Sequence, residues 1–226
     1  GKDLLQRNGI QNVELWGRGV DSDLFHPARR ATADAQALRE CWAPGAEKIV
    51  GYVGRLAPEK QVARLLEVCS LENTRLVVVG DGPDRSDLEH HFSGHNVTFT
   101  GRLSGEELAN AYAAMDVFVH CGTEETFGQT IQEAHASGLP VIAPRKGGQR
   151  HLIRDGVDGF LVDHTQWGAF KQKVTTLVGD DVMRQQFSRE ARAAVADKTW
   201  ATNNEELLRY YDRVRGVAMS ASPIAA

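Results

Sequence analysis

Several features that mark common classes of protein are scarce or missing in this sequence. It has three cysteines in 226 residues and none in CxxC or zinc-finger spacing, which argues against a disulfide framework and fits a reducing compartment. No apolar run approaches the roughly 20 residues needed to cross a bilayer. These absences predict a cytoplasmic protein. The first residue, Gly1, is neither an initiator methionine nor the start of a signal peptide, so we expect a fragment or a processed product.

The sequence also lacks an excess of positive charge. Its 26 basic and 30 acidic residues give a formal net charge of -4, so no general attraction toward nucleic acid or an anionic membrane is expected. The sequence contains no GxSxG, HExxH or Walker A motif, which removes the best support for hydrolase and NTPase functions. We therefore expect no nucleic-acid partner, and any bound anion must be held by a local site.

Two further patterns fall short of a known motif. The Gly80-x-Gly82 pair follows a predicted strand but has no third glycine, so it favours a tight turn over a dinucleotide site and makes an NAD-dependent dehydrogenase or epimerase improbable. Asp21-x-Asp23 fits local turn bonding better than a metal-diphosphate motif. We accordingly expect no metal site.

Short β-branched runs alternate with segments of helical periodicity along the chain. The runs that predict buried strands lie at residues 12–16, 48–54, 75–80, 96–101, 117–120, 140–143 and 159–162. Helical periodicity covers residues 61–69, 85–92, 105–115, 129–137 and 165–177. Such alternation predicts an α/β fold, a Rossmann-like doubly wound parallel sheet with helices on both faces. Its ligands should lie beyond the carboxyl ends of the strands.

The C-terminal region differs in character from this alternation. Residues 1–199 are predicted to form the Rossmann-like domain. Residues 200–226 are predicted to supply a last helix with an apolar face that packs on something else, followed by a disordered tail from Ser220.

A helix start follows the predicted strand at residues 117–120. Thr126 with Gln129 matches a capping box, which predicts that a helix begins at about Phe127. The free N–H groups of Phe127 and Gly128, at the positive end of the helix dipole, could then hold hydroxyl or phosphate oxygens.

Two glutamates flank this helix start. Glu125 lies just before the helix and Glu133 on its second turn, separated along the axis by about 10 Å, so the two carboxylates could grip both ends of one extended ligand. Taken alone, the pair also fits a plainer interpretation. Glu125 would then favour a helix N-terminus, and Glu133 would be a solvated surface residue.

Cations follow two other predicted strands. Gly54 and Arg55 end the strand at residues 48–54, and Lys60 follows after a turn containing proline. Arg55 offers a planar fork and Lys60 a mobile charge, a suitable pair for a diphosphate. The segment from Pro144 to Gly148 supplies two more cations beside the same expected crevice, although a plain glycine turn fits it equally well.

Taken together, these motifs resemble the C-terminal domain of the GT-B retaining glycosyltransferases of family GT4 over roughly residues 12–200. The residues that carry the resemblance are Gly19-Val-Asp21 with Phe25-x-Pro27, Gly54-Arg55-x4-Lys60, Val79-Gly-Asp-Gly-Pro83, Val97-x-Phe-x-Gly101, Glu125-x7-Glu133 and Ala136-Ser-Gly-Leu-Pro-Val-Ile-Ala143. They occur in the family's order. The resemblance implies that this chain is the donor-binding half of a two-domain enzyme, whose N-terminal acceptor-binding domain is absent.

The resemblance also implies roles for particular residues. Arg55 and Lys60 would neutralise the diphosphate, with Gly54 beside them, and Glu133 would bond the ribose hydroxyls. The remaining expected contacts are Glu125, Thr126, Phe127, Gly128 and Gln129 at the donor sugar, and Gly101, Arg102 and Leu103 near the base. Glu125, Arg55 and Lys60 would be the catalytic residues. Such enzymes commonly need no metal or other cofactor, and they retain the anomeric configuration.

The sequence from Val119 to Glu133 is similar to that of actinobacterial GDP-mannose-dependent α-mannosyltransferases that build glycolipids and lipoglycans. This similarity implies GDP-mannose as donor, a glycolipid or glycan as acceptor, and contact with the inner face of the membrane through the missing domain. His120 and Cys121 stand where the family often has Pro-Ser, and Arg18 where it often has Asn, which leaves the donor open. The alternatives are a UDP-sugar donor or a noncatalytic nucleotide-binding module.

Overall fold

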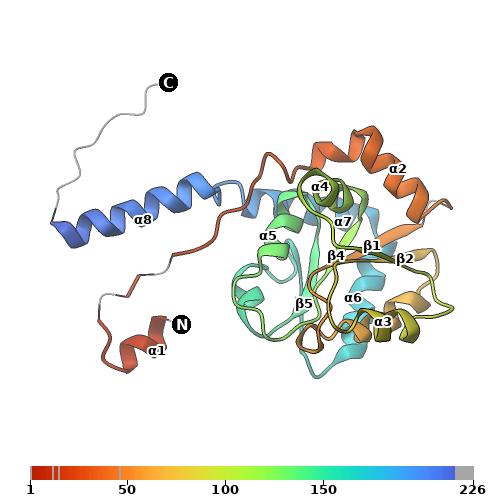
Figure 1. Cartoon of the computed structure of the whole chain (residues 1–226), viewed down its shortest axis with the longest axis horizontal. Coiled ribbons are helices and arrows are strands. Elements are labelled where there is room, and N and C mark those ends of the chain that lie inside the picture. Colours follow the sequence, from red (N-terminus) through yellow and green to blue (C-terminus); the bar gives the residue numbers. More distant parts are fainter. Residues whose placement is uncertain (1, 12, 15, 46, 217–226) are drawn as a thin grey trace. The chain divides into compact units, whose positions relative to one another are not determined.

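The computed structural model describes residues 2–11, 13–14, 16–45 and 47–216 (Figure 1). Its strands are β1 Lys48–Val53, β2 Thr74–Val79, β3 Val97–Gly101, β4 Val117–Val119, β5 Val141–Pro144 and β6 Gly159–Val162. Its α-helices are α1 Lys2–Arg7, α2 Ala33–Trp42, α3 Arg85–His91, α4 Gly105–Ala114, α5 Gln129–Ala136, α6 Trp167–Gly179, α7 Asp181–Ala194 and α8 Trp200–Arg215. Its 3₁₀ helices are η1 Pro27–Ala31, η2 Pro58–Lys60, η3 Val62–Ser70 and η4 Gly148–His151.

The six strands form one parallel sheet in the order β3-β2-β1-β4-β5-β6. This is the doubly wound arrangement expected from the sequence, and the prediction is confirmed. The order reverses between β1 and β4, so the carboxyl ends of these two strands flank the topological switch point where such sheets bind ligands. The loops after β1 and β4 therefore determine what this edge of the sheet can hold.

Apolar side chains cover both faces of the sheet. Along β1, Ile49 and Val53 belong to one core cluster, while Val50 and Tyr52 belong to the other. The first cluster includes residues of α2, α4 and α5, and the second includes residues of η3, α3, α6 and α7. Burial on both sides explains why these strands appear in the sequence as continuous apolar runs instead of alternating patterns.

A buried carboxylate joins the segment before β1 to the amino end of β4. Asp116, 6% exposed, receives hydrogen bonds from Arg30 (2.6 Å), Arg39 (2.9 Å) and the backbone N–H of Ile49 (2.8 Å). Burial alone would raise the pKa of Asp116, but its two arginines and the Ile49 amide outweigh burial and hold that pKa below its usual value. The carboxylate thus ties η1 and α2 to the centre of the sheet.

The chain separates into two compact units. Val20–Ala196 form the sheet and its helices, and Gly1–Gly19 group with Asp197–Ala226 in the other unit. In that second unit the indole N–H of Trp16 donates to the carbonyl of Asn203 at 3.1 Å. The predicted boundary after residue 199 stays a prediction, and the structure adds that the first residues group with the C-terminal segment. Residues 220–226, predicted to be disordered, lie outside the described residues.

One predicted strand was wrong. Asn12 and Leu15 of the run at residues 12–16 lie outside the described residues, and Val13, Glu14 and Trp16 are not in a strand. The run belongs to the unit that contains α8 and not to the unit that forms the sheet, and a strand forms only as part of a ladder with a neighbouring strand.

The helix predicted at residues 61–69 has a different geometry from the one expected. It is the 3₁₀ helix η3, whose buried Val62, Leu65 and Val68 recur every third residue. That spacing matches the three residues per turn of a 3₁₀ helix, in which side chains three apart align on one face. The tighter helix therefore presents one apolar row to the sheet.

Candidate functional site

The loops after β1, β2 and β3 enclose a pocket of about 510 Å³ at the carboxyl edge of the sheet. It is lined by Val53, Gly54, Arg55, Val79, Gly80, Asp81, Gly82, Arg102 and Leu103. The structure thus brings together four of the predicted donor-binding residues, Gly54, Arg55, Arg102 and Leu103. The Gly80-x-Gly82 pair forms the turn expected between β2 and α3, and it also lines the pocket, which the sequence interpretation missed.

Backbone contacts shape the floor of this pocket. The Gly54 N–H donates to the Val79 carbonyl at 3.0 Å, and the Gly80 N–H donates to the Gly101 carbonyl at 2.8 Å. Gly80 has a φ of +138°, and a Cβ added there would lie 1.9 Å from the Gly54 carbonyl oxygen. Only glycine fits this approach. Gly101, predicted near the base, is the last residue of β3 and holds the Gly80 turn in place.

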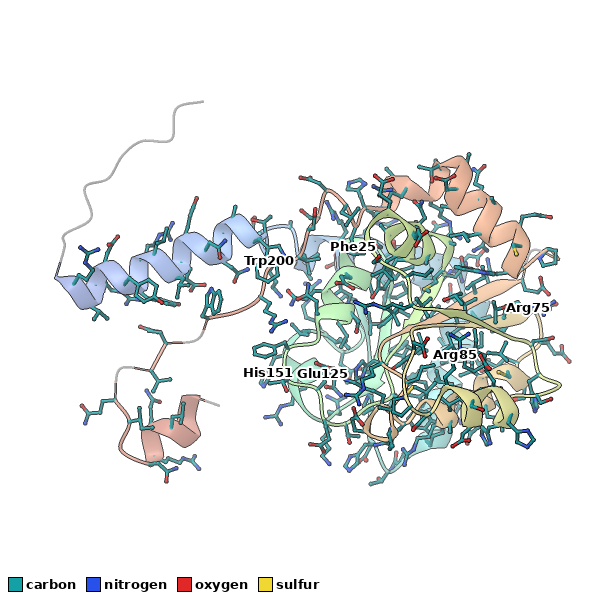
Figure 2. The ribbon with its side chains drawn as sticks, in the orientation of Figure 1. Phe25, Arg75, Arg85, Glu125, His151 and Trp200 are labelled. Carbon is teal, nitrogen blue, oxygen red and sulfur yellow. The ribbon has the colours of Figure 1, made fainter. Side chains whose placement is uncertain are left out.

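Glu125 lies in the loop after β4 (Figure 2), and backbone amides of that loop surround its carboxylate. Glu125 Oε1 accepts hydrogen bonds from the backbone N–H groups of Thr126 (3.2 Å), Phe127 (3.3 Å) and Gly128 (2.9 Å). The amides expected to be free for a ligand are therefore occupied by Glu125 itself. The carboxylate takes the place of a helix cap and fixes the loop in a tight turn.

The predicted capping box was wrong. Helix α5 begins at Gln129, two residues after the expected Phe127, and its N-cap is Gly128 in the left-handed region at φ +64°. A Cβ on Gly128 would lie 2.4 Å from Leu152 Cδ1, so a larger residue there would also have to displace the end of that side chain. Glu125 binds the amides that a Thr126 cap would have used, which explains the later start of the helix.

The second carboxylate oxygen of Glu125 has cationic and imidazole partners. Lys60 Nζ lies 3.0 Å from Glu125 Oε2, and His120 Nε2 lies 3.3 Å from the same oxygen. The hydrogen bond from His120, with those from the Gly128 amide and Lys60, outweighs burial and holds the pKa of Glu125 well below its usual value. Glu125 is therefore ionised throughout the physiological range, and its carboxylate is the anion that Lys60 contacts in this structure.

Glu133 has the opposite electrostatic character. It lies on α5 with Glu133 Oε2 3.0 Å from the hydroxyl of Tyr112, a fully buried residue of α4. Burial raises the pKa of Glu133 to about 7, against the lowering effect of hydrogen bonds from Tyr112 and Gln129. The two glutamates therefore differ, one firmly ionised and one that titrates near neutral pH. Tyr112 is a functional neighbour that sequence reasoning missed, because only the packing of α4 on α5 reveals it.

The segment from Pro144 to Gly148 supports the Glu125 loop through its backbone. The Gly148 N–H donates to the Glu125 carbonyl at 2.7 Å, and the fully buried Gln149 donates from Nε2 to the Gly122 carbonyl at 3.0 Å. Lys146 forms a salt bridge with Glu124, its Nζ lying 3.7 Å from Glu124 Oε1. Gln149 had no distinguishing signal in the sequence, since a lone glutamine after two glycines has no motif.

Patterns set aside in the sequence also have structural explanations. Asp21 Oδ1 accepts the backbone N–H groups of Asp23 at 3.2 Å and Leu24 at 2.9 Å, which confirms a local turn. Across residues 2–11, 13–14, 16–45 and 47–216, no group of three or more His, Cys, Asp or Glu side chains is arranged to hold a metal ion. Over the same residues, no helix combines the length and apolar character needed to span a membrane.

Comparisons with known proteins show the family of this chain. The family model described as "Glycosyl transferases group 1" matches residues 37–194, which is more than half of the chain. A "GDP-mannose-dependent alpha-mannosyltransferase" of Mycobacterium tuberculosis (strain CDC 1551 / Oshkosh) is 46% identical over 215 residues, covering 95% of this chain and 54% of the relative. The protein of the same description from Corynebacterium glutamicum is 44% identical over 210 residues, covering 92% and 49%. The chain thus spans about half the length of the curated relatives it matches.

Solved structures share the fold. The Anabaena protein Alr3699/HepE, crystallised in complex with UDP, superimposes with a TM-score of 0.83 at 23% identity, covering 94% of this chain and 61% of that chain. This likeness confirms the predicted fold, the Rossmann-like C-terminal half of a GT-B glycosyltransferase.

Proposed function

Because this chain belongs to the family of glycosyl transferases group 1, we propose that it is the donor-binding domain of a retaining glycosyltransferase that takes mannose from GDP-mannose. The proposal rests on what gathers at one edge of the sheet. There the β1, β2 and β3 loops enclose a pocket, and Lys60 of the β1 loop donates a hydrogen bond to Glu125 of the β4 loop. The relatives described as GDP-mannose-dependent support the choice of donor.

In this proposal each group of residues binds one part of the donor. The base lies in the pocket near Gly101, Arg102 and Leu103, and the ribose hydroxyls bond to Glu133 on α5. Both are neutral parts of the donor, and both lie beside groups suited to hydrogen bonding. The diphosphate faces Arg55 and Lys60, and the donor sugar faces the loop of Glu125, Thr126, Phe127, Gly128 and Gln129.

The reaction proposed for this site needs stabilisation of a leaving diphosphate. Arg55 can bind its oxygens with a planar fork, and Lys60 can move from Glu125 toward the phosphate because its side chain is flexible. Cations placed in this way can do the work that a divalent metal does in other transferases, so we propose a metal-independent reaction. The anomeric configuration is retained through attack on the same face of the sugar.

The acceptor side belongs to the rest of the enzyme. Helix α8 carries four exposed large apolar side chains, Trp200 (42% exposed), Leu208 (60%), Tyr211 (58%) and Val214 (86%). Apolar rows of this kind are covered when a partner surface is present. The proposed cover is the N-terminal acceptor-binding domain, which also brings a glycolipid or glycan acceptor, at the inner face of the membrane, to the donor.

Mannosyl transfer by the full-length protein tests the proposal. The protein is incubated with radiolabelled GDP-mannose and a membrane lipid extract, and the product is analysed for anomeric configuration. We expect an α-linked mannosyl product, formed in the presence of EDTA. Equal transfer from a UDP-hexose would move the proposal to a UDP-sugar donor, and absence of transfer from any nucleotide sugar would favour a noncatalytic binding module.

Arg55→Lys tests the planar fork. The variant keeps the charge but loses the paired donors, so we expect GDP affinity to fall roughly tenfold, the loss typical of one hydrogen bond to a charged group. Titration calorimetry on this chain measures it. Arg75→Lys is the matched control. Arg75 pairs with Glu47 near the start of β2, whereas the pocket with Arg55 lies at the carboxyl ends of the strands. Equal GDP affinity in wild type and Arg55→Lys would refute the paired contact.

A further inference from the structure

His120 immediately follows β4 and lies inside the molecule, only 2% exposed. Its Nε2 lies 3.3 Å from Glu125 Oε2. An ionised carboxylate can only accept, so Nε2 must carry the proton of this bond. Nδ1 has no hydrogen-bond partner among the residues that the structure describes. A doubly protonated ring would leave that buried N–H unpaired, so the arrangement fits the neutral ring protonated at Nε2.

The two oxygens of Glu125 are held in different ways. Oε1 is bound by backbone amides of its own loop, and Oε2 is bound by the side chains of Lys60 and His120. Lys60 has a long, flexible side chain that is 22% exposed, whereas the His120 side chain is 3% exposed. In the proposed function Lys60 also binds a second anion, the donor diphosphate. As it turns there, His120 is left as the side-chain partner of Oε2.

We propose that His120 is a positioning residue that keeps the Glu125 carboxylate aimed at the donor sugar while Lys60 turns to the diphosphate. The inference rests on the proposed function and adds to it a residue outside the predicted site. The bond from His120 is also the largest cause of the low pKa of Glu125, so the same contact stabilises the ionised carboxylate. The lysine can then change partner without releasing the glutamate.

Two amide substitutions separate this role from packing. The Nε2 group of glutamine can occupy the place of the histidine Nε2, whereas asparagine places its amide near Nδ1, too short to reach Glu125. In the full-length enzyme we expect His120→Asn to lower kcat for mannosyl transfer by roughly 10- to 100-fold, with KM for GDP-mannose changed less than about threefold. His120→Gln should stay within about threefold of wild type.

Both variants remove the ring from the same cavity, so a packing role predicts similar losses in each. Equal kcat in His120→Asn and His120→Gln, whether both low or both normal, would overturn the proposal. Thermal melting of both variants identifies any shared loss of stability. Absence of transfer by the wild-type enzyme would instead overturn the proposed function. The hydrogen bond between His120 and Glu125 can still be tested in that case, by a measurement that needs no activity.

That measurement is ¹⁵N NMR of the histidine rings in this chain, with the His120 signals assigned by their loss in His120→Gln. We expect Nε2 to be protonated and Nδ1 unprotonated at neutral pH. Glu125→Gln should shift the Nε2 signal, because its acceptor loses its charge. His120 signals unchanged by Glu125→Gln would show that the bond does not exist and would overturn the inference regardless of activity.

Discussion

Replacing Glu133 by glutamine is expected to weaken GDP binding by about 1.5–3 kcal/mol, which is roughly a 10- to 100-fold rise in Kd. In the proposed site the ionised carboxylate accepts both ribose hydroxyls, and an amide can accept through one oxygen only. Glu133→Ala should lose at least as much. Titration calorimetry of this chain with GDP measures each change.

Glu107→Gln is the matched control for this substitution. Glu107 lies exposed in the first turn of α4, so the same loss of charge there should leave GDP affinity unchanged. If Glu133→Gln bound GDP as tightly as the wild type, the ribose assignment would fail.

The raised pKa of Glu133 adds a pH dependence to this prediction. With a pKa of about 7 in the free protein, Glu133 is half protonated near neutral pH. Only the ionised form accepts both hydroxyls, so GDP affinity should rise as the pH increases from about 6 to 8 and then level off. Glu133→Gln should remove that rise. A wild-type affinity independent of pH over this range would show that Glu133 does not titrate in the site.

The same group affects stability with the opposite sign. Its pKa is higher in the folded protein than the ordinary 4.5, so the folded state holds this proton more tightly than the unfolded state. Its contribution to the free energy of unfolding is therefore present below about pH 4.5 and lost as the pH rises through 7. Without nucleotide, Glu133→Gln should reduce this decline, which urea unfolding at several pH values measures.

Asp116→Ala is expected to lower the free energy of unfolding by about 3 kcal/mol. The substitution leaves Arg30, Arg39 and the Ile49 amide without their shared acceptor in a site where the carboxylate is 4% exposed at its side chain. Breaking a buried pair by removing one partner is costlier than losing a surface pair, because the remaining groups stay desolvated. Both arginines are partly exposed, which keeps the expected loss near the lower end of the usual range.

Urea unfolding compares Asp116→Ala with Asp87→Ala, a change at an exposed position on α3. If Asp116→Ala lowers the free energy of unfolding no more than Asp87→Ala does, the contacts of Asp116 with Arg30 and Arg39 have no structural role. The pKa of Asp116 is lowered in the fold, so its stabilising contribution is present above about pH 4 and lost as the pH falls through the folded pKa.

Most of the sheet could be predicted from sequence because all its strands except the edge strand β3 are almost wholly buried. All six observed strands coincide with apolar runs, and the glycine after β1 marks where the first of them ends. The run at residues 12–16 also contains apolar residues but forms no strand, because strand formation depends on a neighbour that local sequence does not reveal. The 3₁₀ form of η3 was missed for a similar reason, since its geometry follows from how it packs.

The site was predicted less completely than the sheet. Residues at strand ends, such as Arg55 and Glu125, could be located because the fold places those ends together. The residues that shift the pKa values of the two glutamates could not be predicted in this way. Tyr112 reaches Glu133 only through the packing of α4 on α5, and His120 is a buried ring that belongs to no motif. The capping box failed because the Glu125 carboxylate and the left-handed Gly128 compete with Thr126 for the start of α5.

Titration calorimetry of this chain with GDP and with UDP, each with magnesium and then with EDTA, tests the central claim most directly. We predict that GDP binds more tightly than UDP and that EDTA leaves its affinity unchanged. If neither GDP nor UDP binds, the claim that this domain holds a nucleotide-sugar donor is contradicted.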